Sequence, residues 1–231
     1  MIRVASYNIR KAIGTDRLRR PERILSVIDE VGADIIALQE ADRRFGARKS
    51  ALPPELLDNH GELRPVQFGT GQEGIGWHGN AMLVRSHIKI LDCRPLVIPS
   101  LEPRGAVLVE CRVGKQDLRI VGMHLDLSGL WRKRQVRAIL DAVLQRPEKM
   151  PTILMGDCNE WRNRGGCLHD FAERHQLVDT GHSFHSRRPV ARLDRIFASP
   201  DLQAVDAGVH QSALAARASD HLPIWARFKA R

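Results

Sequence analysis

TILMGDCN, residues 152–159, is an apolar run that ends in a polar turn. A short apolar run bounded by a glycine is typical of a strand that is buried on both faces in an α/β protein. The side chains of Asp157 and Asn159 at its end would lose hydration there unless a bound group compensates them. The segment therefore predicts a buried strand whose end carries a polar functional site.

The same pattern recurs elsewhere along the chain. Arg3–Tyr7 leads into Asn8, Asp34–Leu38 leads into Gln39 and Glu40, and Asp220 and His221 precede Leu222–Phe228. Because strand ends project side chains into a shared cleft, we expect these polar groups to form one site. Mg²⁺ prefers oxygen ligands and usually takes only one or two protein carboxylates. Glu40, with Asn8 beside it, fits that demand.

The chain has 231 residues, and its 36 Lys and Arg against 27 Asp and Glu give a formal net charge of +9. This length suits one large domain, and no Ser-, Gly- or Pro-rich break divides it, so we expect a single domain over residues 1–231. The positive charge favours a polyanionic or phosphorylated partner, such as nucleic acid or an anionic lipid surface. A surface of solvated arginines explains the same composition, and composition alone leaves both readings open.

Nothing in the sequence predicts export or membrane insertion. Met1–Val4 already has the pattern of a strand, so we expect no secretion signal. Every apolar run is shorter than the ~20 residues of a membrane helix. We therefore expect a cytoplasmic, soluble protein, monomeric by default. The cysteines lack Cys-x-x-Cys spacing, which predicts free thiols at Cys93, Cys111, Cys158 and Cys167.

Two helices are predicted with particular detail. Pro21 opens the first, which carries Ile24, Ile28 and Val31 on one face and ends at Gly32. Ser128 can cap the second, whose inner face is expected to carry Val136, Ile139, Leu140, Val143 and Leu144.

Strand patterns alternate with these helices. In addition to the segments above, they cover residues 2–9, 81–85, 88–95, 106–113, 118–124, 193–198 and 204–209, with short helices expected at 55–57 and 168–175. The looser pattern of residues 41–78 indicates a variable loop. Strand hairpins that alternate with isolated helices predict two packed sheets with helices on the outer faces.

The polar segments fall in a fixed order along the chain. They are Asn8, Gln39-Glu40, Gly122-Met123-His124-Leu125, Gly156-Asp157-x-Asn159, Leu193-Asp194-Arg195-Ile196-Phe197 and Ser219-Asp220-His221-Leu222-Pro223. Together with Gly79-Asn80-Ala81 and Arg104-Gly105-Ala106 between them, this series resembles the endonuclease/exonuclease/phosphatase superfamily, in its small bacterial-type members. The resemblance covers essentially the whole chain. It implies a DNase I-like four-layer α/β sandwich with two mixed sheets flanked by helices, and divalent-metal-dependent hydrolysis of a phosphodiester or phosphomonoester, with Mg²⁺ or Mn²⁺.

The resemblance also implies a role for each residue. Hydrolysis of a phosphate ester requires a base for the attacking water, a cation for the developing charge, and donors to the phosphoryl oxygens. His221 resembles the family's general base, and Asp194 the carboxylate that fixes its tautomer. Glu40 resembles the principal metal ligand, with Asn8 and Asp220 completing or approaching the ion. Asp157 resembles the residue that orients the water, and Asn159 and His124 resemble donors to the phosphate.

Each of these residues has a plainer interpretation. Asp157-x-Asn159 is also the pattern of an Asx turn, and His124 could pair with Asp126 at a strand end. Asn80 could donate to the phosphate or finish a turn. Arg104 could clamp a phosphate or be a solvated cation. The register of the whole set favours the functional interpretation.

The sequence leaves three hypotheses for the substrate. The first is a nuclease-type phosphodiesterase, which the net charge supports. The second is a phosphodiesterase or phosphatase that acts on a lipid or a small metabolite. The third is a non-catalytic basic module that binds nucleic acid. Glu160–Gly166, which follows the Asp157-x-Asn159 motif, does not resemble the continuation found in abasic-site nucleases. Trp161, which precedes Arg162, could stack on a base or simply anchor the loop against the core.

Overall fold

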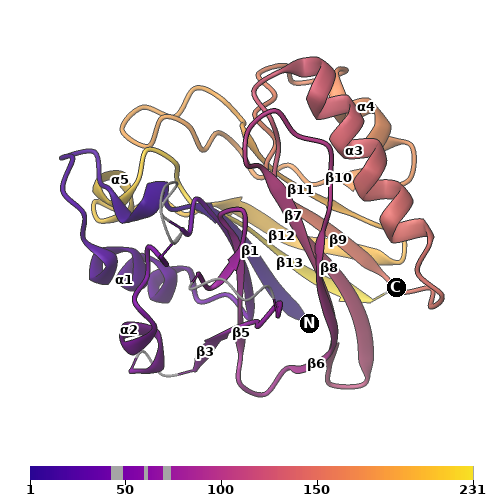
Figure 1. Ribbon diagram of the computed structural model, residues 1–231, viewed down its shortest axis with the longest axis horizontal. Coiled ribbons are helices and arrows are strands. Elements are labelled where there is room, and N and C mark those ends of the chain that lie inside the picture. Colours follow the sequence, from indigo (N-terminus) through magenta and orange to yellow (C-terminus); the bar gives the residue numbers. More distant parts are fainter. Residues whose placement is uncertain (43–48, 60–61, 70–73, 231) are drawn as a thin grey trace.

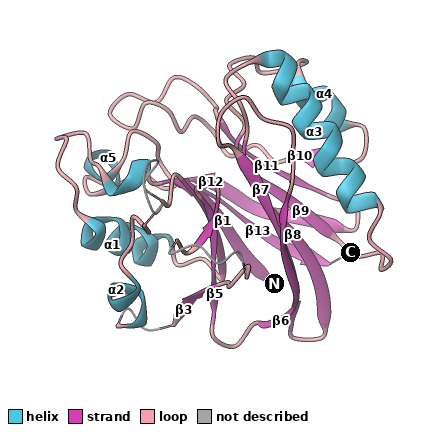
Figure 2. Cartoon of the chain, in the orientation of Figure 1, coloured by secondary structure: helices cyan, strands magenta, loops and turns pink. Residues whose placement is uncertain are grey.

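Two β-sheets lie face to face, and helices cover their outer faces (Figure 1; Figure 2). The computed structural model describes residues 1–42, 49–59, 62–69 and 74–230. Within these residues the first sheet has seven strands in the order β12-β13-β1-β2-β5-β3, with β4 paired to β5. Its strands are β1 (Ile2–Asn8), β2 (Ile35–Gln39), β3 (Leu63–Pro65), β4 (Gly76–Trp77), β5 (Asn80–Arg85), β12 (Leu202–Val209) and β13 (Ile224–Ala230).

The second sheet has six described strands in the order β10-β11-β9-β8-β7-β6. These are β6 (Lys89–Leu96), β7 (Gly105–Val113), β8 (Gln116–His124), β9 (Thr152–Asp157), β10 (Gln176–Leu177) and β11 (Asp194–Ala198). Each sheet contains one parallel pair, β1 with β2 and β8 with β9, and the other described pairs are antiparallel. Both sheets are therefore mixed.

The helices are α1 (Pro21–Val31), α2 (Pro54–Asp58), α3 (Gly129–Leu144), α4 (Cys167–Ala172) and α5 (Ala215–Ala218), with a short 3₁₀ turn η1 (Arg10–Ala12). α1, α2 and α5 lie beside the first sheet, and α3 and α4 cover the second (Figure 1). Pro21 is the first residue of α1, and Gly32 ends it at a φ of 59°. These ends confirm the boundaries predicted from Pro21 and Gly32.

Alternation of side chains along the strands explains the layers. In β1, Ile2 and Val4 face the second sheet, whereas Ala5 and Tyr7 pack under α1. In β9, Ile153 and Met155 face the first sheet, and Leu154 packs under α3 and α4. Because successive side chains point to opposite faces, the fully apolar strands are buried on both sides. The result is the expected four-layer sandwich.

Two details of the second long helix differ from the prediction. Ser128 occupies the position before α3, but its side chain makes no capping hydrogen bond. Leu144 is 53% exposed, because at 3.6 residues per turn it points away from the row that contains Val136, Ile139 and Val143. Two polar residues, Arg132 and Gln135, share the buried face instead.

The region predicted as a loose loop has some regular structure. Its short helix, α2, forms where expected, while β3 and β4 were not predicted. Residues 43–48, 60–61 and 70–73 of this region lie outside the described part of the chain. Among the described residues, no helix combines the length and apolar character needed to span a bilayer. The four cysteines are free thiols, and Cys158 is fully buried.

Candidate active site

The polar ends of strands from both sheets meet at one edge of the sandwich. β1 and β2 run in parallel and end at Asn8 and Gln39, while β8 and β9 end together at His124 and Asp157. Asn8, His124 and Asp157 continue the rows of side chains that face the opposite sheet, so they point into the seam between the sheets. The side chain of Asn8 donates to that of Asp157 across the seam, over 3.0 Å.

Gly156 brings β9 close enough to β8 for this arrangement. Its φ is 155°, and a Cβ added there would lie 1.9 Å from the carbonyl oxygen of Met123. Only glycine tolerates both conditions. The glycine before Asp157 is therefore a structural requirement of the strand end.

Asp157 is the centre of the site. Its Oδ2 accepts from Asn8 and lies 3.4 Å from His124 Nε2 and 3.7 Å from His221 Nε2. Its Oδ1 accepts the backbone N–H of Asn159 at 2.9 Å. The Asx turn suggested by the sequence is thus present, and the same carboxylate also faces two imidazoles.

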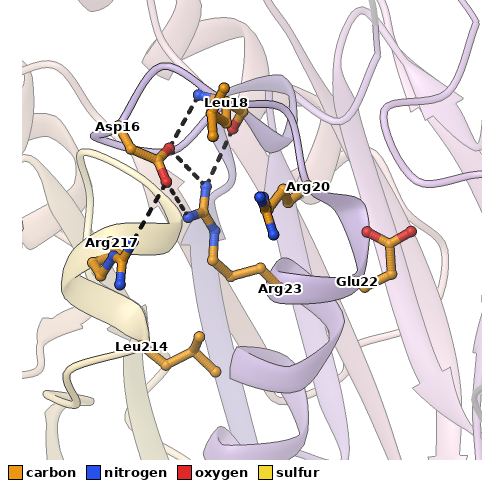
Figure 3. Close-up of a pocket in the computed structure, with 7 residues that line it drawn as sticks. All are labelled: Asp16, Leu18, Arg20, Glu22, Arg23, Leu214 and Arg217. Atoms are coloured by element: carbon orange, nitrogen blue, oxygen red, sulfur yellow. Dashed lines mark hydrogen bonds and ion pairs between the residues drawn. The ribbon is translucent and has the colours of Figure 1, made fainter.

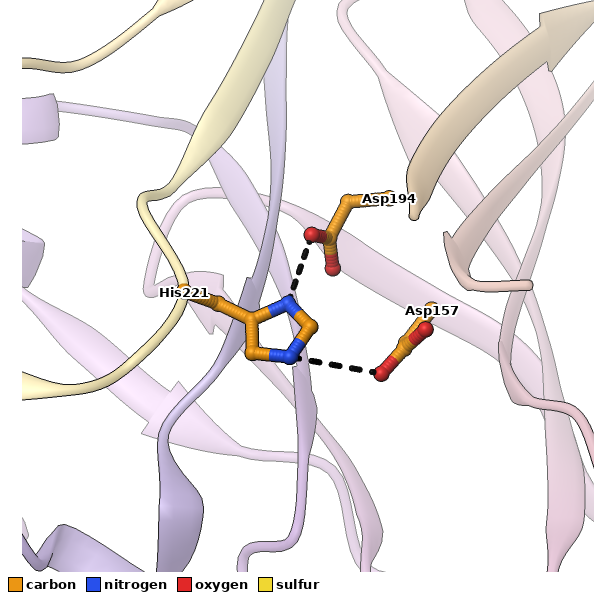
Figure 4. Close-up of side chains that lie close together, drawn as sticks. All are labelled: Asp157, Asp194 and His221. Carbon is orange, nitrogen blue, oxygen red and sulfur yellow. Dashed lines mark hydrogen bonds and ion pairs between the residues drawn. The ribbon is translucent and has the colours of Figure 1, made fainter. Parts of the chain in front are cut away.

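His221 is held from its other side by Asp194, as Figure 4 shows. His221 Nδ1 donates to Asp194 Oδ2 over 2.8 Å, and Ser183 Oγ donates to the same oxygen over 2.5 Å. Asp194 begins β11, which pairs antiparallel with β9, so it lies directly opposite Asp157. Leu222 and Pro223 join His221 to the start of β13 at Ile224, which pairs with Ser6 near the end of β1.

Burial and neighbouring charges set the ionisation of the pair. Burial alone lowers the pKa of His221, but the carboxylates of Asp194 and Asp157 outweigh it and raise the pKa to about 10. Burial raises the pKa of Asp157 to about 6, with Asp194 adding to the rise and His221 opposing it. The two carboxylates therefore favour the imidazolium form of His221 at neutral pH.

Glu40 lies on the other wall of the site, just after β2. It lines a small pocket of about 30 Å³ together with Lys11, Asp42, His78, Arg104 and His124. Lys11 Nζ forms an ion pair with Glu40. Burial opposes ionisation of Glu40, but Lys11, Arg104 and His221 together keep its pKa below the ordinary value. His124 lines this pocket and lies 3.4 Å from Asp157, which in turn faces His221, so Glu40 and the imidazole lie at the same edge of the sandwich.

Asp220 and Asn8 adjoin this wall. Asp220 Oδ2 lies 3.3 Å from Arg10 Nε, and Asn8 Oδ1 accepts the backbone N–H of Arg10 at 3.1 Å. Ser219 Oγ donates to the carbonyl of Asn8 over 2.7 Å, which joins the loop before β13 to the end of β1. Glu40, Asn8 and Asp220 thus offer an all-oxygen donor set, which suits a hard cation.

The remaining predicted residues also lie at this edge. Asn159 Nδ2 donates to the carbonyl of Leu125 over 2.9 Å. Arg104 Nη1 contacts the ring of His124, 2.9 Å from Nδ1. Asn80 is fully buried and donates to the carbonyl of Gly105 over 3.0 Å, while its Oδ1 has no hydrogen-bond partner. Asn80 Nδ2 also lies 3.4 Å from the carbonyl oxygens of Trp77 and His78, which are the contacts of a turn, whereas Arg104 lines the pocket.

Sequence reasoning missed several residues of the site. Ser183 holds Asp194, and the ring of Phe184 lies 4.9 Å from that of His221. Neither has a recognisable pattern, because they belong to an irregular loop. Lys11 and Arg10 were visible only as part of a basic loop. The only sign of a role at the site was that they closely follow Asn8 in the sequence.

Comparisons with known proteins give the family match and the structural neighbours of the chain. The model of a family described as "Endonuclease/Exonuclease/phosphatase family" matches residues 5–221. The uncharacterized protein YbhP of Escherichia coli strain K12 is 27% identical over 220 residues, which cover 84% of this chain and 83% of YbhP.

Solved structures share the fold. D. rerio TDP2 complexed with single strand DNA product is 18% identical with a TM-score of 0.73, covering 99% of both chains. The mannosyl-6-phosphatase Bt3783 of Bacteroides thetaiotaomicron is 18% identical with a TM-score of 0.72, covering 99% of this chain and 100% of its own.

Proposed function

Because the chain belongs to the endonuclease/exonuclease/phosphatase family, we propose that it hydrolyses a phosphodiester with the help of a divalent cation, and that His221 is the general base. The observation that carries this proposal is the buried row Asp194, His221 and Asp157, with His221 Nδ1 bound to one carboxylate and Nε2 facing the other. Such a row fixes the tautomer of the imidazole and aims Nε2 at the seam.

His221 Nε2 and Asp157 Oδ2 together can hold the attacking water. The two atoms are 3.7 Å apart, so one water to the side of the pair can contact both. Asp157 would orient this water, and His221 would accept its proton, with Asp194 stabilising the imidazolium that forms. Arg104, His124 and Asn159 would donate to the phosphoryl oxygens.

The residues around Glu40 fit a divalent cation. The donor set is all oxygen. The Glu40 carboxylate is paired with the ammonium of Lys11, so its surroundings already accommodate positive charge. We propose that Glu40, Asn8 and Asp220 hold Mg²⁺, with Mn²⁺ as a substitute. A cation there would supply charge neutralisation at the phosphoryl oxygens. Its field would also lower the pKa of His221 toward the range in which a base works.

The cluster of Asp157, Asp194 and His221 could in principle hold a metal as well, since their ligand atoms lie within 4.8 Å of one another. The hydrogen bond between His221 Nδ1 and Asp194 argues against this use, because it occupies the nitrogen and the oxygen that would face an ion. We therefore assign the cluster to acid–base chemistry and the Glu40 wall to the cation.

Turnover of bis(p-nitrophenyl) phosphate with Mg²⁺, Mn²⁺ or EDTA tests the proposal. We expect wild-type turnover that EDTA abolishes, and a loss of roughly 10²–10⁴-fold in kcat for His221→Gln and Asp194→Asn. His182→Gln is the matched control, because His182 is an exposed histidine of the neighbouring loop and should change little. Equal turnover by wild type and His221→Gln would exclude His221 as the base, and no turnover above background by either protein would favour a non-catalytic basic module.

The alternative function is hydrolysis of a lipid or small-metabolite phosphate. The mannosyl-6-phosphatase among the structural neighbours supports it by fold only. The TDP2 structure with single strand DNA product, and the net charge of +9, support the nuclease-type substrate. Release of phosphate from monoesters without cleavage of any diester would select the alternative.

A further inference from the structure

An aromatic wall extends from His221 to the protein surface. The ring of Phe184 lies 4.9 Å from His221, and the indole of Trp161 lies edge-on to Phe184 at 5.8 Å. Trp161 is 63% exposed, although a large aromatic side chain on a loop gains by burial. Trp161 comes from the loop after β9 and Phe184 from the loop before β11, so two separate segments build the wall.

Three basic segments continue from this wall. They are residues 10–23, which run from η1 into the first turn of α1, the loop of residues 185–188, and α5 with its Arg217. Arg187 Nη2 donates to the carbonyl of Thr15 over 3.4 Å, and Ser186 Oγ donates to the carbonyl of Ala216 over 3.2 Å. These contacts tie the three segments into one surface, and the backbone N–H of Ser186 donates to the carbonyl of Asp220 at 2.8 Å, which attaches that surface to the site.

Several arginines of this surface are exposed to solvent. Arg17, Arg20, Arg187 and Arg188 are exposed and form no ion pair with any residue in the described ranges. Arginines elsewhere on the surface do pair, such as Arg112 with Asp117 at 2.6 Å and Arg94 with Asp92 at 2.6 Å. Unpaired cations that gather on one surface favour an external anion.

The surface is also concave. A hollow of about 580 Å³ lies between Arg20, Arg23 and Glu22 on one side and Leu214 and Arg217 on the other (Figure 3). Asp16 binds Arg23 through two hydrogen bonds of 2.6 and 3.1 Å at its rim, while Arg217 Nη2 is 3.9 Å from Asp16. Arg23 is therefore neutralised and fixed, and Arg20 keeps its charge available.

We propose that the aromatic wall and this basic surface together bind a single-stranded nucleic acid. This inference rests on the proposed function and names its substrate class. One base would stack on Trp161, and the backbone phosphates would follow Arg187, Arg188 and Arg20 away from the site. A sugar phosphate or an isolated headgroup carries too few phosphates to use cations spread over three segments. A duplex keeps its base faces stacked and would leave the indole without a partner.

Binding can be measured without turnover. Fluorescence anisotropy of labelled oligonucleotides in EDTA, over a salt series, gives affinity and the slope of log K against log salt. Wild type should bind single strands more tightly than duplexes and longer strands more tightly than short ones. The triple variant Arg20→Ala/Arg187→Ala/Arg188→Ala should reduce the salt slope by about 2, since each phosphate contact in a single strand contributes about 0.7.

Variants of Trp161 test the stacking interaction separately from the charges. Trp161→Ala should weaken single-strand binding by roughly 5- to 150-fold, and Trp161→Phe should retain most of the affinity. Arg174→Ala is the matched control, because Arg174 is exposed and lines a hollow at the other end of β8, near Gln116. It should leave both the salt slope and the turnover of bis(p-nitrophenyl) phosphate unchanged. Deoxyribose and ribose strands of one sequence distinguish DNA from RNA, and binding to either supports the proposal.

Four results would overturn the inference: duplex binding as tight as single-strand binding, vesicles of anionic lipid as the only ligand, an unchanged salt slope in the triple variant, or Trp161→Ala behaving like Arg174→Ala. Failure of this inference can be distinguished from failure of the proposed function. Wild-type turnover of the small diester without single-strand binding rejects only the inference, whereas single-strand binding without any turnover rejects only the catalytic proposal.

Discussion

Asp157 contacts three polar side chains, from β1, β8 and the loop before β13, and each contact has a physical reason. Its carboxylate is buried, which raises its pKa to about 6, and Asn8 partly compensates it with a hydrogen bond. A carboxylate next to an imidazole in a buried seam is costly to keep for stability alone. At the scale of single residues, this contact set is the strongest indication of catalysis.

The contact of Lys11 with Glu40 was not predicted from the sequence. Arg10, Lys11 and Ala12 have positive φ values of 46°, 55° and 59°, a conformation that costs roughly 1–2 kcal/mol per residue outside glycine. The backbone N–H of Lys11 donates to the carbonyl of Glu40 at 3.0 Å, and its ammonium pairs with the Glu40 carboxylate. Strain of this kind tends to persist at functional sites.

A prediction at this scale concerns the cation. The Lys11 ammonium and a divalent ion compete for Glu40, so Lys11→Met should tighten metal binding by roughly 3- to 10-fold. Titration of Mn²⁺, followed by electron paramagnetic resonance or calorimetry, measures this without turnover. Lys49→Met provides a control at an exposed lysine after β2. Weaker Mn²⁺ binding by Lys11→Met would mean that Lys11 supports the metal site instead.

At the scale of elements, the sequence predicted what depends on local patterns. The apolar runs located the long strands, and Pro21 and Gly32 located α1, because these signals act within a few residues. The strand ends also predicted the site, since side chains alternate and parallel strands end together. β3, β4 and β10 were missed because strands of two or three residues depend on their neighbours in the sheet for stability.

The loop residues of the site could not be predicted from the sequence. Ser183 and Phe184 contact Asp194 and His221 only through the fold, and no spacing in the sequence relates them. Arg132 interrupts the apolar pattern on the inner face of α3. The structure explains its position, because Arg132 forms an ion pair with Glu160 at 3.1 Å. Pairings across long stretches of sequence of this kind are a property of the tertiary structure.

Gly156 allows a test of the strand end. Gly156→Ala places a methyl group against the Met123 carbonyl and requires a φ that L residues rarely adopt, so we expect a loss of roughly 2–5 kcal/mol in the free energy of unfolding. Urea denaturation measures it. Gly114→Ala is the control, because Gly114 has a φ of 61° with nothing within 4 Å and should cost only about 1 kcal/mol. Equal losses in both variants would contradict the close approach of β9 to β8.

At the scale of the whole molecule, the inner faces of the two sheets are apolar over most of the seam and become polar, though still buried, at the edge that carries the site. Ile2, Ile120, Ile153 and Phe228 fill the seam away from that edge, while Asn8, His124, Asp157 and Asp194 end its rows. Apolar burial elsewhere therefore supports a group of buried polar residues that would destabilise the fold if it stood alone. The stability of the molecule and the ionisation of its site are consequently linked.

This linkage predicts the pH dependence of stability in the metal-free protein. The pKa of His221 is raised from 6.5 to about 10, so its protonated form stabilises the folded state. That contribution is complete below about pH 6.5 and is lost as the pH rises toward 10. The raised pKa of Asp157 acts in the same direction at lower pH, between its ordinary value of 3.8 and about 6. Buried Tyr7 titrates above its ordinary pKa and does not contribute within this window.

Thermal unfolding in EDTA between pH 7 and 8 isolates the histidine, because the buried thiols of Cys111, Cys158 and Cys167, whose pKa values burial also raises, affect stability only nearer pH 9. The free energy of unfolding of the wild type should fall by about 1 kcal/mol over this range, whereas that of His221→Gln should stay nearly constant. Carboxylates with lowered pKa values, such as Glu110 beside Arg146, affect stability only at acid pH and leave this range undisturbed. Parallel curves for wild type and His221→Gln would show that His221 is neutral in the free protein. They would also remove the electrostatic reason for a cation to adjust its pKa.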